Sequence, residues 1–238
     1  MMKKVYEIIY SIVYSLFIFY ETVNDFWNNL KKQSNNSITL EYFEEKGFEC
    51  LKKKPNHITF IIDEEPSFKD LANLVLWCLI ARISFVSFYD YRGVLEKNEE
   101  KLEIEINRIK QQNDYVLWHN RKSDSKNGIV GRKVHLKIIT KADGKYNIER
   151  VCRELITKKE SVSNISIEYV DKCLKEQFGF PDPEVGIIFS KIFSLFEYPP
   201  WEIRLTEFFR LNSHHNILFS EFVAVLDKYS KCNQRLGT

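Results

Sequence analysis

HITFIIDEEPSFKDLANLVLWCLIARISFVSFYD, residues 57–90, decides the fold class of this chain. It opens with a β-branched apolar run, which is typical of a buried strand. Apolar residues then recur at helical spacing over 68–78, and Pro66 stands where the first turn of a helix tolerates proline. A second buried strand over 83–89 ends at Asp90. A strand, a helix of this length and another strand predict a crossover unit with parallel strands.

The same alternation continues downstream. We expect a charged helix over 94–112, a loop without periodicity over 113–131, a strand over 133–140, a helix over 147–159, a strand over 165–169 that leads into a helix over 170–178, a buried strand over 185–190, and closing helices over 201–211 and 220–232. The sequence therefore predicts an α/β domain with a mainly parallel central sheet, flanked by helices on both faces.

The composition limits the classes of function. Of 238 residues, 44% are apolar and 29% charged, which is enough to bury a sizeable core. The 35 Lys and Arg against 33 Asp and Glu leave a formal charge of +2. That balance argues against a general nucleic-acid binder, which would carry a concentrated basic excess. The five cysteines form no C-x-x-C pair, so we expect buried free thiols in a reducing compartment and no metal site of their own.

The N-terminal segment is unusually apolar and aromatic. Residues 5–20 read VYEIIYSIVYSLFIFY, with lysines on both sides. A helix of this length reaches roughly 24 Å, short of a hydrocarbon core of roughly 30 Å. We expect a membrane anchor, and leave open whether it spans the bilayer or lies in its interface; a buried core helix is the alternative. The predicted domains are therefore 1–37, anchor helix and linker, and 38–238, the folded domain.

The familiar catalytic motifs are absent. The chain has no G-x-G-x-x-G, G-x-x-x-x-G-K-[ST], G-x-S-x-G or H-E-x-x-H motif. We interpret His214 and His215 as a solvated turn before the last helix. Asp63 follows the first strand, and ligands in open α/β sheets bind beyond the carboxyl ends of the strands. Asp63 is therefore the best positional candidate for a site residue, although an acidic helix start would give the same pattern.

Four stretches carry a resemblance. Residues 65–93, 181–184 (PDPE), 199–208 (PPWEIRLTEF) and 232–238 (CNQRLGT) resemble the Nogo-B receptor family, the non-catalytic subunit of the eukaryotic cis-prenyltransferase that makes dehydrodolichyl diphosphate. The resemblance implies a fold like that of undecaprenyl diphosphate synthase, with an N-terminal hydrophobic helix. It also implies pairing with a catalytic cis-prenyltransferase subunit, as a heterodimer or a dimer of heterodimers.

Catalytic members of that wider family follow the first strand with D-G-N-x-R, in which the aspartate assists Mg²⁺-dependent handling of the diphosphates. Asp63 falls at the aspartate position here, but Glu64 and Glu65 replace the Gly and Asn, and no arginine follows in the motif. Added carboxylates repel a diphosphate. The phosphate cradle is therefore lost, and Mg²⁺ is expected to be bound mainly by the catalytic partner.

A second diphosphate motif of catalytic members, R-T-S-G-E-x-R-L-S, is also missing. By register its two arginines fall near Ile188 and Ser194, and its serine near Phe196. The guanidinium fork matches phosphate oxygens bidentately, and none of these side chains can replace it. We expect no activity from the chain alone.

The C-terminal Arg235, Leu236 and Gly237 match the family's R-x-G tail. The resemblance implies that this tail crosses to the partner and completes its isopentenyl diphosphate site. Arginine suits phosphate, and glycine lets backbone N–H groups approach a ligand closely. A partner interface is expected as well, since the last segments carry more large apolar residues than one small domain usually needs. The expected interface residues are Trp201, Arg204, Phe208, Phe219 and Phe222.

The expected function is that of an accessory subunit. With its partner, the chain would support extension of farnesyl diphosphate by isopentenyl diphosphate, for dolichol synthesis and protein glycosylation. It would sit at the endoplasmic reticulum membrane with its domain facing the cytosol, and would bind no nucleic acid. Two alternatives stay open: a self-sufficient homomeric cis-prenyltransferase that uses Asp63, and a membrane-tethered receptor or scaffold protein without a role in catalysis.

Overall fold

The computed structural model describes residues 51–119, 131–158 and 165–232, together with Tyr6, Tyr10 and 13–15 near the N-terminus. The strands are β1 (His57–Ile62), β2 (Phe85–Asp90), β3 (Asp114–Trp118), β4 (Arg132–Ile139), β5 (Val185–Phe189) and β6 (Glu207–Leu211). The helices are α2 (Phe68–Ile80), α3 (Val94–Lys97), α4 (Glu99–Ile109), α5 (Lys145–Thr157), α6 (Ile167–Phe178) and α7 (Phe219–Lys231), with short 3₁₀ turns η1 (Lys141–Asp143) and η3 (Pro200–Glu202).

The six strands form one sheet in the order β3-β4-β2-β1-β5-β6, and every neighbouring pair is parallel. β1 lies in the middle, with His57 opposite Phe85 of β2 and Ile58 opposite Val185 of β5. The predicted α/β class with a parallel sheet is confirmed. Because all strands run one way, their carboxyl ends share one edge of the sheet and their amino ends share the other.

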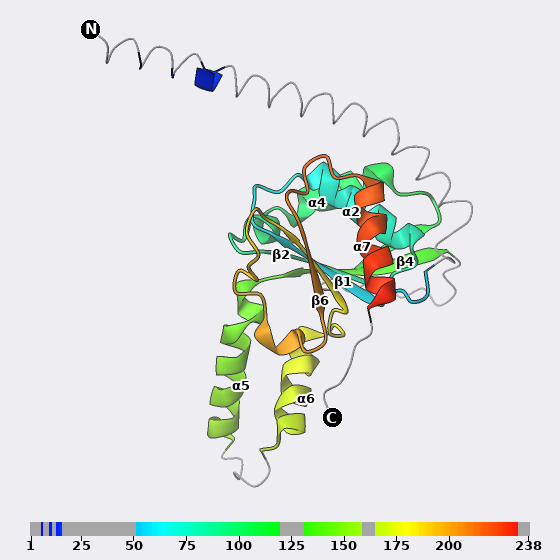
Figure 1. The fold of residues 1–238 in the computed structure, drawn as a ribbon. Coiled ribbons are helices and arrows are strands. Elements are labelled where there is room, and N and C mark those ends of the chain that lie inside the picture. The colour runs from blue at the N-terminus through cyan, green and yellow to red at the C-terminus, as the bar shows by residue number, and fades with distance from the viewer. Residues whose placement is uncertain are drawn as a thin grey trace.

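One face of the sheet is covered by α2, α4 and α7 (Figure 1). Alternate residues of the central strand, Ile58, Phe60 and Ile62, are fully buried against this layer. The ring of Trp77 on α2 packs against Phe219 and Phe222 of α7, with ring centroids 5.4 and 5.8 Å away. Burying apolar surface of this extent is the main stabilising term of the domain.

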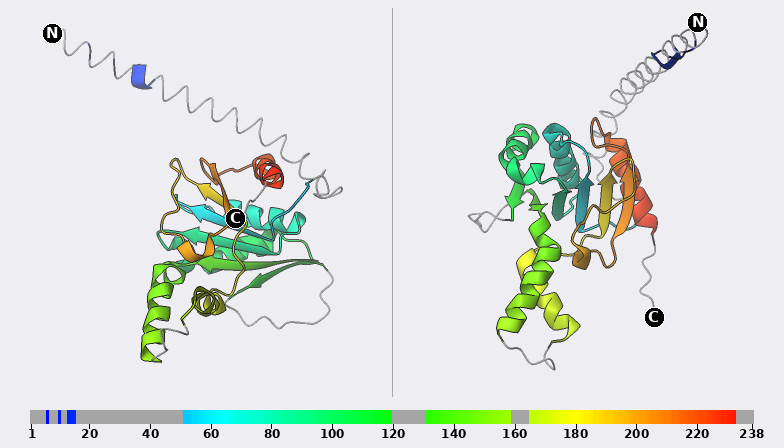
Figure 2. Two further views of the ribbon diagram at one scale, coloured as in Figure 1. Left: turned by 60° about the horizontal axis from the view of Figure 1, so that its bottom comes forward. Right: turned by 90° about the vertical axis from the view of Figure 1, so that its left-hand side faces the viewer.

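The opposite face carries a smaller core. Ile61, Tyr89, Ile188 and Tyr198 are buried there, beside the end of α6. Helices α5 and α6 pack on each other and project away from the sheet (Figure 2). Their contact is apolar, and includes Val151 and Leu174.

The region 113–131 was predicted to be a loop. Part of it is a strand, because residues 114–118 form β3. The guanidinium of Arg132 donates to both carboxylate oxygens of the buried Asp114, at 2.7 and 2.9 Å. A bidentate pair of this kind is strong. It fixes the start of β3 against the start of β4, a long-range contact that periodicity does not reveal.

The prediction of a helix over 201–211 is wrong. The segment consists of η3 and the edge strand β6. Phe208 packs toward the α5–α6 side of the sheet, whereas Phe209 and Leu211 pack against the core under α7. Side chains that alternate between two faces are the pattern of a strand. Because both faces of β6 contact apolar residues, the sequence does not show the polar and apolar alternation that usually identifies a strand.

Two further elements differ from the predictions. No strand forms at 165–169, because Ser166 caps α6 and its hydroxyl accepts a hydrogen bond from the Tyr169 backbone N–H. The charged helix over 94–112 is broken into α3 and α4 at Asn98, whose side chain donates to the Val94 carbonyl.

The prediction of buried thiols is right for Cys78, but Cys152 is exposed. Cys50 lies outside the described residues.

The predicted anchor over 5–20 lies largely outside the described residues. Tyr6, Tyr10 and 13–15 are helical and exposed, and the rings of Tyr10 and Tyr14 stack with centroids 6.1 Å apart. Within the described part of the chain, no helix combines the length and the apolar character that a membrane span requires. The anchor and the division at residue 37 stay predictions.

Candidate functional site

The carboxyl ends of β1, β5 and β6 meet at one edge of the sheet and bring Asp63 to the predicted position. The Asp63 backbone N–H donates to the Phe189 carbonyl at 3.2 Å, and the Ser190 hydroxyl donates to Asp63 Oδ2 at 2.9 Å. Ser190 in turn donates its N–H to the Leu211 carbonyl at 3.1 Å. Asp63 is half-buried. It is the first side chain past the central strand, where ligands of such sheets bind.

Glu64 is bound by the turn that precedes α7. Its Oε1 accepts hydrogen bonds from the Ser213 hydroxyl and the His214 backbone N–H, both at 2.7 Å, and lies 2.6 Å from His214 Nδ1. Burial alone would raise the pKa of Glu64, but these hydrogen bonds and the nearby His214 lower it below its usual value. Glu64 is therefore an ionised carboxylate whose donors come from this chain itself.

His214 is fully buried, so the prediction of a solvated turn is wrong for this residue. Its Nε2 accepts a hydrogen bond from the Ser67 backbone N–H at 2.8 Å, which places the ring proton on Nδ1, facing Glu64. Burial lowers the pKa of His214 and outweighs the attraction of Glu64. The adjacent His215 is exposed, and its ring lies 4.4 Å from that of His214. The turn therefore closes over the start of α2.

Glu64, His214 and His215 could be read as a metal centre, because one ligand atom of each lies within 4.8 Å of the others. The donor set does not fit that reading. His214 would have to coordinate through Nδ1, which carries its proton while Nε2 accepts from Ser67. His215 Nε2 lies 2.9 Å from the Glu65 carbonyl and so donates there. Glu64 instead holds the turn at Ser213 and His214, a contact here called the clasp, and His215 binds the neighbouring Glu65 carbonyl.

A second carboxylate occupies the end of β2. Asp90 is buried and accepts hydrogen bonds from the backbone N–H groups of Arg92, Val94 and Leu95, at 2.9, 2.5 and 3.2 Å. These donors border a cleft of about 270 Å³ between the ends of β2 and β4, which Lys97 and Lys141 also line. An incoming anion would find the backbone donors already taken by Asp90.

The positions that correspond to the second diphosphate motif carry no charge toward this edge. Ile188 is fully buried within β5. The Ser194 hydroxyl accepts from the Phe196 backbone N–H at 3.2 Å. Phe196 and Glu197 adopt left-handed backbone conformations, with φ of 47° and 63°, and the Tyr89 hydroxyl fixes the turn by donating to the Phe196 carbonyl at 2.7 Å. The turn is therefore held in a strained backbone conformation by this chain's own hydrogen bonds, and it presents no arginine to a phosphate.

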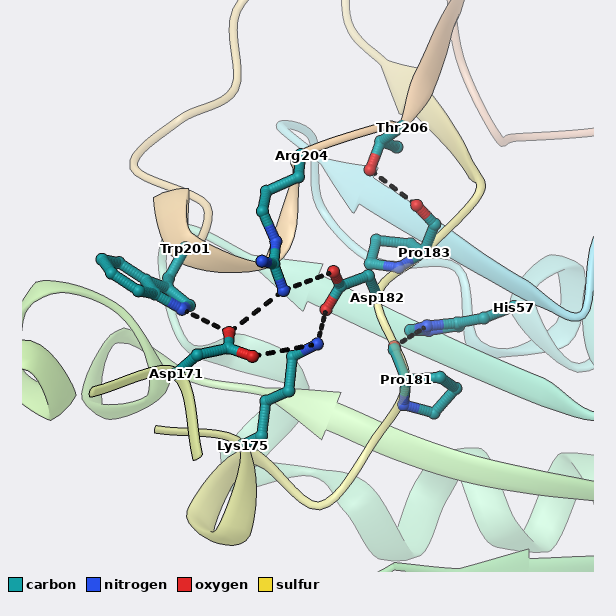
Figure 3. Close-up of polar contacts among 9 residues, drawn as sticks. All are labelled: His57, Asp171, Lys175, Pro181, Asp182, Pro183, Trp201, Arg204 and Thr206. Atoms are coloured by element: carbon teal, nitrogen blue, oxygen red, sulfur yellow. Dashed lines mark hydrogen bonds and ion pairs between the residues drawn. The ribbon is translucent and has the colours of Figure 1, made fainter. Parts of the chain in front are cut away.

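Two predicted interface residues, Trp201 and Arg204, lie at the other edge of the sheet, where the strands begin (Figure 3). Trp201 Nε1 donates to Asp171 Oδ1 at 2.8 Å, and Arg204 Nη2 donates to the same oxygen at 3.0 Å. Arg204 also lies 3.3 Å from Asp182. Burial alone would raise the pKa of Asp171, but Trp201 and the neighbouring cations lower it. Arg204 is exposed, so the same group could also contact a partner.

The PDPE segment that holds Asp182 is fixed by backbone contacts. His57 Nδ1 donates to the Pro181 carbonyl at 2.6 Å, and its Nε2 accepts from the Ser87 hydroxyl at 2.8 Å. The Thr206 hydroxyl donates to the Pro183 carbonyl at 2.6 Å (Figure 3). Burial lowers the pKa of His57 to about 4, so this histidine is neutral and structural. The PDPE segment, which precedes β5, is therefore hydrogen-bonded to β1 through His57 and to the start of β6 through Thr206.

Glu202 is a buried acid beside this network, with 1% of its surface exposed. Burial raises the pKa of Glu202 to about 7, and the nearby Asp182 raises it further against the opposing effect of Lys175. Glu202 Oε2 is buried and forms no hydrogen bond within the described part of the chain, whereas Asp182 Oδ1 lies 3.5 Å from the Lys175 ammonium. Burial beside another carboxylate disfavours the charged form of Glu202.

The remaining predicted interface residues divide into two groups. Phe208 is half-buried on the edge strand, where its ring covers Gly186; a Cβ at Gly186 would lie 2.4 Å from that ring. Phe219 and Phe222 are fully buried against Trp77. The interface prediction is therefore wrong for Phe219 and Phe222, whose apolar surface is consumed by the core of this chain.

Some features of the site were not predicted and others cannot be placed. The acidic cluster after β1 and the histidine pair were each visible in the sequence, but nothing in the sequence indicated that Glu64 and His214 meet. Asp90 was seen only as the end of a strand. The predicted tail residues Arg235, Leu236 and Gly237 lie outside the described residues.

Solved structures share this fold. Lavandulyl diphosphate synthase from Lavandula x intermedia matches with a TM-score of 0.55 and 13% identity, over 76% of this chain and 98% of that one. A probable undecaprenyl diphosphate synthase from Campylobacter jejuni matches with a TM-score of 0.52 and 14% identity, over 78% and 100%. The chain therefore shares the fold of these diphosphate synthases, and in this chain the fold has a parallel six-stranded sheet.

Sequence relatives identify the family within this fold class. Dehydrodolichyl diphosphate synthase complex subunit NUS1 of Homo sapiens is 33% identical over 202 residues, covering 79% of this chain and 68% of the relative. The subunit of the same name from Schizosaccharomyces pombe is 32% identical over 205 residues, covering 79% and 78%. No family model matches the chain. The chain belongs to the NUS1 family of dehydrodolichyl diphosphate synthase complex subunits.

Proposed function

We propose that this chain is the accessory, non-catalytic subunit of a heteromeric dehydrodolichyl diphosphate synthase. Its catalytic partner would extend farnesyl diphosphate with isopentenyl diphosphate, for dolichol synthesis and protein glycosylation. One observation carries the proposal beyond family membership. At the edge where a prenyl diphosphate synthase fold presents its ligand site, backbone N–H groups are bound by this chain's own carboxylates, Glu64 and Asp90.

A diphosphate at this edge would meet unfavourable charge. Glu64 is ionised, and its Oε1 already accepts hydrogen bonds from the Ser213 hydroxyl and the His214 backbone N–H and lies 2.6 Å from the His214 ring. Asp90 holds three backbone N–H groups. Both would have to give up their hydrogen bonds and then repel the ligand, each at a cost of about 1–3 kcal/mol for the hydrogen bonds alone. These contacts support a chain that does not turn over substrate by itself.

Mg²⁺ is better placed on the partner. This ion prefers octahedral oxygen ligands and keeps several waters. Of the three carboxylates at the strand ends, Glu64 and Asp90 already accept several hydrogen bonds from N–H and O–H donors of this chain, and Asp63 accepts from Ser190. The donor set does not fit a magnesium site in the described part of this chain.

The chain would contribute three things to the complex. Residues 5–20 would tether it to the endoplasmic reticulum membrane, with the domain facing the cytosol. Trp201 and Arg204, which precede the edge strand β6, and Phe208, within that strand, would form part of the partner interface. Arg235 and Gly237 would reach the partner's isopentenyl diphosphate site, where a guanidinium can bind phosphate bidentately.

The test is isopentenyl transfer to farnesyl diphosphate by the purified chain, alone and co-expressed with a catalytic cis-prenyltransferase. We expect turnover only in the mixture. Arg235→Ala should lower turnover of the purified complex by about tenfold or more without dissociating it, as loss of a phosphate-binding arginine does. The matched control is Arg108→Ala, which removes an exposed arginine of α4 that forms only a 3.8 Å pair with Glu105.

Other outcomes favour the alternatives. Activity of the chain alone would mean a homomeric synthase that uses Asp63. Unchanged turnover after deletion of residues 235–237 would favour a membrane-tethered scaffold without a role in catalysis.

A further inference from the structure

The amino ends of all six strands form one continuous edge of the sheet. Backbone hydrogen bonds connect neighbouring strand starts along it. The Arg132 N–H donates to the Asn113 carbonyl, that of His135 to Ser84, that of Phe85 to Asn56, that of Glu184 to His57, and that of Glu207 to Glu184, at 2.8–3.1 Å. The chain enters this edge from Leu51, which packs against the core under α7.

Helices α2 and α4 end at the same edge, since Arg82 follows α2 shortly before β2 and Lys110 caps α4 shortly before β3. The last turn of α7 lies there too, because the Lys53 ammonium stands 4.2 Å from the centre of the Tyr229 ring. Several exposed cations result from this convergence. They are Lys52, Lys54, Arg82, Lys110, Lys133 and Lys228, here called the basic edge.

Within the described part of the chain, none of the basic edge residues forms an ion pair. The carboxylates nearby are mostly committed elsewhere. Asp114 binds Arg132, Asp227 binds Lys231, and Glu105 binds Arg108. The Glu184 carboxylate lies at the start of β1, where it accepts from the backbone N–H groups of Asn56 and His57, and Glu207 stands at the start of β6. The six exposed cations outnumber these two carboxylates, and the positive charge is most concentrated from β2 to β3.

Helix dipoles do not explain the whole cluster. Cations near the ends of α2, α4 and α7 complement the negative carboxyl ends of those helices. Lys52 and Lys54 precede β1, and Lys133 stands on β4, so these three have no such role. Exposed lysines that serve neither a helix end nor an ion pair leave the surface open to an anionic partner.

We propose that the basic edge lies against the anionic headgroups of a lipid bilayer. The proposal rests on the membrane tether of the proposed function, because the chain from residues 5–20 reaches the domain at Leu51, beside Lys52 and Lys54. The tether and the cations therefore share one edge of the domain. Each lysine or arginine near an anionic surface contributes about 1 kcal/mol of attraction. The opposite edge, with Asp63, faces away from the bilayer in this orientation.

The experiment uses the full chain with vesicles of phosphatidylcholine alone, and of phosphatidylcholine mixed with phosphatidylserine. Hydrogen exchange is followed by mass spectrometry over 82–84, 110–113 and 132–133. We expect exchange at these segments to slow at least about threefold in the phosphatidylserine vesicles, and the effect to vanish at high salt. Residues 191–197, at the opposite edge, should exchange equally in both vesicles.

A charge reversal and a matched control test the named residues. The combined variant Arg82→Glu, Lys110→Glu and Lys133→Glu should lose the phosphatidylserine-dependent protection. The combined variant Lys97→Glu, Lys145→Glu and Lys191→Glu reverses the same amount of charge among exposed residues of the opposite edge, and should retain it. Circular dichroism establishes that both variants are folded.

The outcomes separate this proposal from the tether. Binding to pure phosphatidylcholine vesicles reports on residues 5–20 alone, and its absence would contradict the tether. Equal exchange in both vesicles would overturn the basic edge, whether or not the tether binds. Equal protection by soluble glycerophosphoserine, without vesicles, would also overturn it, because the ligand would then be a free headgroup rather than a bilayer.

Discussion

Glu64 Oε1 and His214 Nδ1 lie 2.6 Å apart, although 150 residues separate the two in the chain. Their contact fastens the turn before α7 to the end of β1, at the edge where open α/β sheets bind their ligands. In this chain, the same edge carries the carboxylates Asp63, Glu64 and Asp90.

Glu64→Ala should destabilise the fold. The Ser213 hydroxyl and the His214 backbone N–H would lose their acceptor and the His214 ring its neighbouring charge, and a buried unsatisfied donor costs about 1–3 kcal/mol. Because the pKa of Glu64 is lowered in the folded state, its contribution is present above its unfolded value and is lost as the pH falls through the folded value. Thermal unfolding should therefore show the largest difference from the native chain near neutral pH. Glu65→Ala, at an exposed neighbour, should change little; a similar loss in both variants would contradict the clasp.

Glu202→Gln should stabilise the chain at alkaline pH. The pKa of Glu202 is raised to about 7 by burial, so its favourable effect is complete below the unfolded value and is lost as the pH rises through about 7. Glutamine stays neutral throughout. We expect the Tm of the variant to exceed that of the native chain by several degrees at about pH 8, for an effect on the order of 1–2 kcal/mol, and to match it at about pH 5. A pH-independent difference would show that Glu202 does not titrate in this range.

Asp63→Asn should leave turnover of the complex within about twofold. The asparagine carbonyl can still accept the Ser190 hydroxyl, and the proposed function gives Asp63 no part in catalysis. The measurement is isopentenyl transfer by the co-purified complex. A loss of tenfold or more, with the complex intact, would place Asp63 in the reaction.

Phe222→Ala should unfold or strongly destabilise the domain, by about 3–5 kcal/mol, since a fully buried ring against Trp77 is lost. Phe208→Ala removes a half-buried ring on the edge strand and should cost less stability while weakening association with the catalytic partner. Thermal unfolding and pull-down of the partner, measured on both variants, distinguish the two roles. Equal effects of both variants on partner binding at matched stability would contradict the assignment.

The sequence was sufficient for the central elements because their patterns are strong. The run 57–62 and the helical spacing over 68–78 each have one interpretation, and together they require parallel strands. The pattern failed where both faces of an element are apolar, as at Phe208 and Phe209 in β6. It failed also where a long-range ion pair, Asp114 with Arg132, holds a short strand in an otherwise polar region.

The sequence predicted the position of the candidate site in the fold, but not the contacts between its side chains. Asp63 was found because the carboxyl end of a central strand has a known role in such sheets. The clasp between Glu64 and His214, and the raised pKa of the buried Glu202, depend on contacts between distant segments, which one sequence does not report. The family resemblance supplied what geometry did not, including the tail residues Arg235 and Gly237.

The contact of Lys53 with Tyr229 has a mechanical consequence. Tension on the N-terminal segment would enter the domain at Leu51 and act along β1, which is hydrogen-bonded on both sides by β2 and β5. Pulled along its axis, such a strand loads all of its hydrogen bonds together rather than one after another. The last turn of α7 would feel the same pull through Tyr229. A domain held by this corner would therefore bear a load on its N-terminal segment while its opposite edge keeps its shape.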